Sequence, residues 1–149
     1  MTSGFCQTAP TQTETLEAAK VRSVVEGIIA ADNARDLARV LSYYAEDAIL
    51  LPLNDSPVVG KEKIKPRYEA LFANYQPEIK VAIEEVTVTQ DWAFVRGYNT
   101  GRLLPLKAGE PRVLSDVFLM ILRRTDDERW EIARLMWHLA PTLKAEMKQ

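Results

Sequence analysis

The sequence predicts an α+β fold in which helices cover one face of a curved, mainly antiparallel sheet. Up to about residue 72, apolar residues recur mostly at three- and four-residue steps, the period of an amphipathic helix. From Pro77 onward they alternate with a period of two, which is typical of half-buried strands. The expected order is helix, helix, strand, helix and then four long strands, so the helices should share one face of the sheet. A bent sheet wrapped over a long helix leaves a conical cavity, a natural site for a small molecule.

Length and composition predict one cytoplasmic domain. The 149 residues fit a single domain over residues 13–140, between a disordered tail of residues 1–12 and a C-terminal tail of residues 141–149. The formal charge of −2 gives no electrostatic footprint for nucleic acid or an anionic membrane. No apolar run has the length of a membrane span, and no signal peptide is recognisable. The single cysteine, Cys6, excludes an internal disulfide and fits a reducing compartment.

The first part of the domain predicts two consecutive helices. A hydroxyl and a carboxylate at Thr11 and Glu14 have the spacing of a capping box, and an apolar stripe follows over residues 13–31. We expect Asp32 and Asn33 to break this helix and Asn33 to cap the next one, with Asp36 in its first turn. The second helix should end near Tyr43 and Tyr44.

A short strand and a third helix follow. Residues 45–48 are expected to turn into a strand over residues 49–51, and a loop rich in Pro, Asn, Asp and Ser comes next. Gly60 can cap a third helix. Pro66 lacks a backbone donor, so it should kink this helix or move its regular part to begin near Lys65.

The remaining chain predicts four strands. The apolar parity changes at Glu84 and Glu85, which indicates a β-bulge in the first of them. The strand over residues 112–124 is apolar on both faces, so we expect helices on one face and a second subunit on the other, giving a homodimer. In the last strand, residues 129–139, we expect the face of Leu135 and Trp137 to line the cavity, with Trp130 and Ile132 on the opposite face.

Several segments together resemble one superfamily. The stretches YAEDAILLP (residues 44–52), VVGKEKI (58–64), DVFLMILRR (116–124) and RWEIARLMWH (129–138) are similar to the nuclear transport factor two-like superfamily, and most of all to its SnoaL-like and ketosteroid-isomerase-like members. The resemblance covers about residues 14–139. It implies a cystatin-like, cone-shaped α+β barrel, with three N-terminal helices packed on a strongly curved sheet.

The catalytic residues known in such relatives are absent at the corresponding positions. Where ketosteroid isomerases carry a base, a tyrosine and a protonated acid, this chain has Pro52, Ile28 and Met120. The Asp-Arg-Asp set of limonene epoxide hydrolases corresponds to residues 97–99 and Leu135 here. The residues of this chain at these positions cannot carry out the chemistry of either set. Their absence favours ligand binding over catalysis.

Two titratable residues are the candidates for acid–base chemistry. Asp116 lies in an otherwise apolar strand, where burial beside apolar side chains would raise its pKa; the alternative is a carboxylate near the strand's start that is solvated or paired with an arginine. His138 is the only histidine, and its alternative is a structural role at the cavity rim. The residues expected to line the cavity are Tyr44, Asn99, Asp116, Phe118, Met120, Leu135 and Trp137.

The leading hypothesis is therefore a protein that binds a small apolar or cyclic molecule. An alternative is a cofactor-independent isomerase, cyclase or dehydratase acting on a carbonyl-containing ring, with Asp116 or His138 as acid or base. A second alternative is a homo-oligomerisation module. We expect no cofactor and no metal, since no phosphate-binding glycine loop and no cysteine- or histidine-based ligand set is present. Nucleic acid and membrane are not expected as partners.

Overall fold

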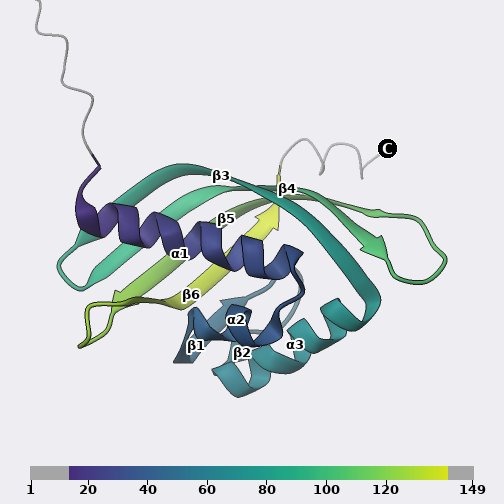
Figure 1. Ribbon diagram of the computed structural model, residues 1–149, viewed down its shortest axis with the longest axis horizontal. Helices are drawn as coiled ribbons and strands as arrows, with labels where there is room; N and C mark the ends of the chain where they lie inside the picture. Colours follow the sequence, from purple (N-terminus) through teal and green to yellow (C-terminus); the bar gives the residue numbers. More distant parts are fainter. Residues whose placement is uncertain (1–13, 141–149) are drawn as a thin grey trace, which may run out of the picture.

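Within residues 14–140, three helices pack on one six-stranded sheet (Figure 1). The computed structural model describes residues 14–140, so both expected tails, residues 1–12 and 141–149, lie outside the described residues. The strand order is β2-β1-β6-β5-β4-β3; β1 runs parallel to β6 and every other pair is antiparallel. This confirms the predicted α+β class. In chain order the elements are α1 (Leu16–Asn33), α2 (Leu37–Ser42), β1 (Tyr44–Leu51), β2 (Val58–Val59), α3 (Lys61–Asn74), β3 (Tyr75–Thr89), β4 (Trp92–Pro105), β5 (Arg112–Arg124) and β6 (Trp130–Leu139).

Helix α1 begins and ends later than the sequence predicts. Its N-cap is Thr15, whose side chain accepts a hydrogen bond from the backbone N–H of Ala18, so the helix begins at Leu16 rather than near residue 13. Thr11 of the expected capping box lies outside the described residues. The helix continues through Asp32 to Asn33, which corrects the expected break. The amide of Asn33 instead bonds both backbone groups of Ile79, at 2.9 and 2.8 Å, and ties the helix to β3. Asp36 takes the cap of α2 by accepting from Arg39 N.

Strand β1 and helix α3 also correct the prediction. The turn expected at residues 45–48 is strand, because Tyr44 already pairs with Ile132 of β6. Gly60, with φ of 94°, precedes α3, and its carbonyl accepts bonds from the backbone N–H groups of residues 63 and 64. This first turn starts the helix at Lys61 rather than near Lys65, and Pro66 lies within it.

Register shifts decide which residues face the core. The predicted bulge is confirmed as a shift between Ile83 and Glu85 in the pairing of β3 with β4. A second shift in the pairing of β5 with β6 leaves residue 133 without a partner, so the side-chain parity of β6 changes there. Trp130 and Ile132, expected on the outer face, are therefore 4% and 0% exposed and belong to the core. Trp130 Nε1 donates to Glu17 of α1 at 2.8 Å.

Helix α1 lies along β3 and across the sheet, while α3 packs beside β1 (Figure 1). The main core lies between these helices and the sheet. On the opposite sheet face Tyr98, Val113 and Met136 are exposed. The homodimer expected through this face stays a prediction. No helix within residues 14–140 combines the length and hydrophobicity that a membrane span requires.

Candidate functional site

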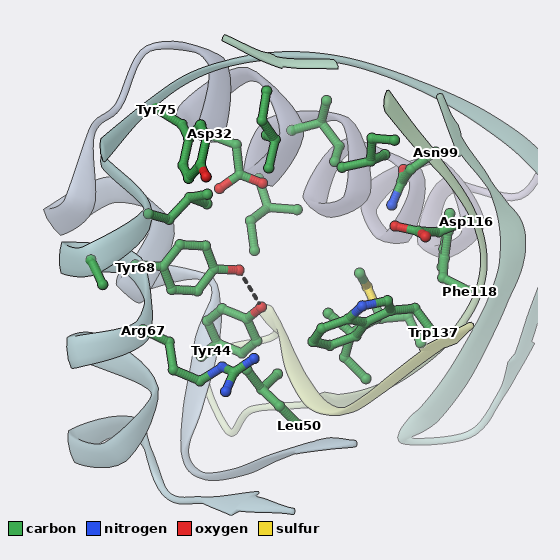
Figure 2. A pocket seen from close by; sticks show the side chains of 18 of the residues that line it. Asp32, Tyr44, Leu50, Arg67, Tyr68, Tyr75, Asn99, Asp116, Phe118 and Trp137 are labelled. Carbon is green, nitrogen blue, oxygen red and sulfur yellow. Dashed lines mark hydrogen bonds between the residues drawn. The ribbon is translucent and has the colours of Figure 1, made fainter. Parts of the chain in front are cut away.

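A cavity of about 620 Å³ lies between α1, α3 and the curved sheet (Figure 2). Most of its lining is apolar, with Val25 and Ile28 from α1, Leu71 from α3 and Leu114 from β5 among the lining residues. The structure also places in this lining all the residues that the sequence analysis expected there: Tyr44, Asn99, Asp116, Phe118, Met120, Leu135 and Trp137. Whether they bind a ligand stays a prediction.

One group of polar side chains comes from the helices and β1. We call Asp32, Tyr44 and Tyr68 the helix-side cluster. The hydroxyls of Tyr44 and Tyr68 lie 2.7 Å apart and share a hydrogen bond. Figure 2 shows the Asp32 carboxyl group directed into the cavity on the same side as this tyrosine pair. Asp32 therefore lines the same side of the cavity as the two phenolic hydroxyls.

Asp32 is buried without a compensating interaction. Asp32 is 8% exposed, and no group within residues 14–140 donates a hydrogen bond to its Oδ1 atom. Burial alone raises the pKa of Asp32 from the ordinary 3.8 to about 7, because an ionised carboxylate loses its hydration. Burial also raises the pKa of Tyr44 and of Tyr68, and the charge of Asp32 adds to both shifts. Near neutral pH the cluster thus holds neutral tyrosines beside a carboxyl group that can gain or lose a proton.

A second polar group comes from the sheet. Asn99 of β4 and Asp116 of β5 are direct cross-strand partners, and we call them the sheet-side pair. Their side chains lie next to each other in Figure 2, away from the helix-side cluster. Burial raises the pKa of Asp116, which is half-buried, and the nearby charge of His138 lowers it in part. The Oδ1 atom of Asn99 is buried and accepts no hydrogen bond from residues 14–140.

The two arginines that line the cavity are engaged with other groups. Arg67 of α3 forms an ion pair with Asp55 of the loop before it, at 2.9 Å. Arg112 of β5 places its guanidinium group 5.8 Å from the ring centroid of Tyr75. Neither arginine has an ion pair with Asp32 or Asp116.

His138 lies outside the cavity lining. It is exposed, its Nδ1 lies 2.9 Å from the carbonyl oxygen of residue 139, and it alternates with the lining residue Trp137. Its side chain therefore belongs to the outer face of β6. Within residues 14–140 no three His, Cys, Asp or Glu side chains come together as metal ligands.

Sequence reasoning did not select Asp32 or Tyr68 as site residues. The sequence analysis expects Asp32 to break a helix, and it assigns Tyr68 no role in the site. A signal for Asp32 is present, however: Val21, Val25 and Ile28 are buried on one stripe of α1, and Asp32 continues it one turn later. A carboxylate on the buried stripe of a helix is rare enough to mark a candidate site.

The chain belongs to the SnoaL-like family, because the sequence model of the SnoaL-like domain matches residues 25–133, more than half of its length. No curated protein matches the sequence.

Solved structures agree with this assignment. A ketosteroid isomerase-like protein from Erwinia carotovora atroseptica is 25% identical, with a TM-score of 0.76 over 83% of this chain and 95% of that one. An NTF2-like protein of unknown function from Pseudomonas putida is 18% identical, with a TM-score of 0.66 over 83% and 86% of the two chains. An NTF2-like protein with a cystatin-like fold from Novosphingobium aromaticivorans is 16% identical, with a TM-score of 0.65 over 87% of each. The last two show the fold alone, and they support the expected cystatin-like architecture.

Proposed function

We propose that this protein binds a small, largely apolar cyclic molecule in the cavity between α1, α3 and the sheet. The observation that carries the proposal is a mainly apolar lining with two buried polar atoms, Asp32 Oδ1 and Asn99 Oδ1, that have no hydrogen-bond partner among residues 14–140. Apolar walls with a few placed polar groups are what small-molecule sites share. A buried polar atom costs free energy when it has no partner, and a ligand that supplies the partner removes this cost.

The two polar groups also suggest how such a ligand is oriented. The helix-side cluster and the sheet-side pair come from different walls of the cavity, so a ring system between them can place one polar substituent at each (Figure 2). The side chains of Leu135 and Trp137 provide apolar surface for the ring itself. A rigid bicyclic molecule with one or two oxygen substituents fits this description.

The test uses α-tetralone, a bicyclic ketone, and its hydroxylated analogue 6-hydroxy-α-tetralone, with binding measured by calorimetry. Leu114 lines the cavity, so the variant Leu114→Trp should fill part of it and weaken binding by about tenfold or more. Val113, the preceding residue of β5, is 70% exposed on the opposite face and supplies the matched control Val113→Trp, which should bind as the wild type does. The proposal fails if the wild type binds neither ketone, or if both variants bind equally well.

A further inference from the structure

Asp32 is a buried acceptor that the fold leaves without a partner. Its side chain continues a stripe of α1 whose other members are apolar, and no group within residues 14–140 donates to its Oδ1 atom. Desolvation is the one cause of its raised pKa, so no hydrogen bond and no cation in the described part of the chain compensates its charge. An apolar side chain would suit this position better, and a group that burdens the fold in this way is a candidate for ligand recognition.

The charged side chains that line the cavity differ in depth. Asp32 is buried and Asp116 is half-buried, whereas both lining arginines, Arg67 and Arg112, are exposed. The arginines also have the other partners described above. Among the lining residues, the buried charge is therefore negative whenever Asp32 is ionised.

The tyrosine pair on the same side of the cavity can also receive a donor. Tyr44 and Tyr68 share one hydrogen bond between their hydroxyls, and phenolic oxygens accept hydrogen bonds as well as donate them. The charge of Asp32 adds to the raised pKa of both tyrosines, so its field reaches their hydroxyls. A primary ammonium group has three N–H donors, and it can be shared between a carboxylate and a phenolic oxygen on one wall.

We propose that the cavity selects a cationic ligand, a primary amine on a largely apolar ring system, whose ammonium group pairs with the Asp32 carboxylate. This inference rests on the proposed function, since the amine must occupy the same cavity. It narrows that function, which leaves the charge of the ligand open.

The depth of Asp32 suits such a pair. Moving an ammonium group out of water has a large cost, and a buried ion pair gains little free energy when both partners must be desolvated on binding. Here the fold has already removed water from the carboxyl group, so binding adds the desolvation cost of the ligand alone. The attraction between the two charges is also stronger in the low dielectric of a buried site. We therefore expect a preference of about tenfold over a neutral ligand of the same shape.

The protonation state of Asp32 should control this preference. With a pKa of about 7, its carboxyl group is mostly neutral at pH 6 and mostly ionised at pH 8. A primary ammonium group keeps its proton up to about pH 9. The affinity for the amine should therefore rise about tenfold from pH 6 to pH 8, and binding at pH 6 should release about one proton from Asp32 to the buffer.

The other groups around Asp32 should add little to this pH dependence. The titratable and charged groups that line the cavity with it are Tyr44 of β1, Arg67 and Tyr68 of α3, Tyr75 of β3, and Arg112 and Asp116 of β5. Arginines stay charged in this range, and burial keeps Tyr44 and Tyr68 neutral. Burial raises the pKa of Asp116 too, so this residue needs a variant of its own.

The experiment compares 1-aminotetralin with α-tetralone, which carries a carbonyl group in place of the amine on the same bicyclic ring. Calorimetry at pH 6 and pH 8, each in two buffers of different ionisation enthalpy, measures both affinities and the protons released. In the wild type at pH 8 the amine should bind about tenfold more tightly than the ketone. Asp32→Asn should reduce this preference to about twofold or less and abolish the proton release. Glu26→Gln removes an exposed carboxylate from the same helix and is the matched control, which should keep the wild-type preference.

Proton release by the wild type needs no variant, so it tests the inference even if Asp32→Asn does not fold. Ketone binding without a preference for the amine, or amine binding that releases no proton at pH 6, would overturn the inference and leave the proposed function standing. A preference that survives Asp32→Asn and is lost in Asp116→Asn would place the cation at the sheet-side pair and overturn it as well. Absence of binding of the amine and of both ketones would remove both proposals.

Discussion

The two polar regions of the cavity bury a carboxyl group in different ways. In the helix-side cluster, Asp32 is almost fully buried, and desolvation acts on its pKa without opposition. In the sheet-side pair, Asp116 is half-buried, and the charge of His138 on the outer face offsets part of the shift. Asp32 meets the cavity from a helix, while Asp116 lies beside Asn99 on adjacent strands.

This difference gives the two regions different chemical properties. A carboxyl group that titrates near neutral pH can exchange protons with a ligand, whereas a half-buried one beside an amide is suited to hydrogen bonding. Under the proposed function both regions hold a polar substituent of the ligand, and the helix-side cluster has a carboxyl group that can change its protonation state near neutral pH. The same difference should be visible in stability, because the cost of burial is larger for Asp32.

The largest expected effect is that of Asp32→Leu, which should stabilise the protein at pH 8. Between the ordinary pKa of 3.8 and the folded pKa of about 7, the folded state holds a proton that the unfolded state releases, so the free energy of unfolding falls as pH rises through this window. Three pKa units correspond to about 4 kcal/mol, which is the upper estimate for the gain at pH 8. At pH 5 the gain from this term should be about 1 to 2 kcal/mol. Urea unfolding at both pH values measures the difference.

Glu26→Leu is the control for Asp32→Leu. Glu26 is exposed on the same helix, so its replacement should change the free energy of unfolding by about 0.5 kcal/mol or less at either pH. A gain in Asp32→Leu that is equal at pH 5 and pH 8 would show that Asp32 does not titrate in this window. The comparison between the two regions would then lose its electrostatic basis.

A smaller effect is expected from Tyr44→Phe, which removes the hydrogen bond within the helix-side cluster. Tyr44 is fully buried, and its loss leaves the Tyr68 hydroxyl without this partner. The free energy of unfolding should fall by about 1.5 kcal/mol, the usual cost of an unpaired buried polar group. Urea unfolding measures it, with Tyr98→Phe on the exposed sheet face as a control that should change little. Equal values for the two variants would show that the tyrosine pair is not a structural unit.

The sheet-side pair could be placed from the sequence, whereas the helix-side cluster could not. Strand alternation over residues 112–124 and 129–139 fixes which side chains share a face, so Asp116 and Trp137 were placed on the face that lines the cavity. Asp32 was missed because a carboxylate followed by asparagine usually ends a helix, and here tertiary contacts override that preference: Asn33 bonds β3 and carries α1 past Asp32. The bulge that turns Trp130 inward was missed because one unpaired residue leaves no distinct pattern.

The smallest expected effect is that of Asn99→Leu in the sheet-side pair. It tests whether an amide group available for ligand binding lowers the free energy of unfolding. The Oδ1 atom of Asn99 is buried and has no donor in the part of the chain that the structure describes, so Asn99→Leu should raise the free energy of unfolding by about 1 kcal/mol. Asparagine does not titrate, so this gain should be nearly the same at pH 5 and pH 8, unlike that of Asp32→Leu. Calorimetry of the same variant should show weaker binding of 6-hydroxy-α-tetralone than in the wild type, while binding of α-tetralone, which lacks the hydroxyl group, should change less. A loss of stability would mean that the Oδ1 atom is already satisfied, for instance by an ordered water, and that the sheet-side pair has no unfilled acceptor for a ligand.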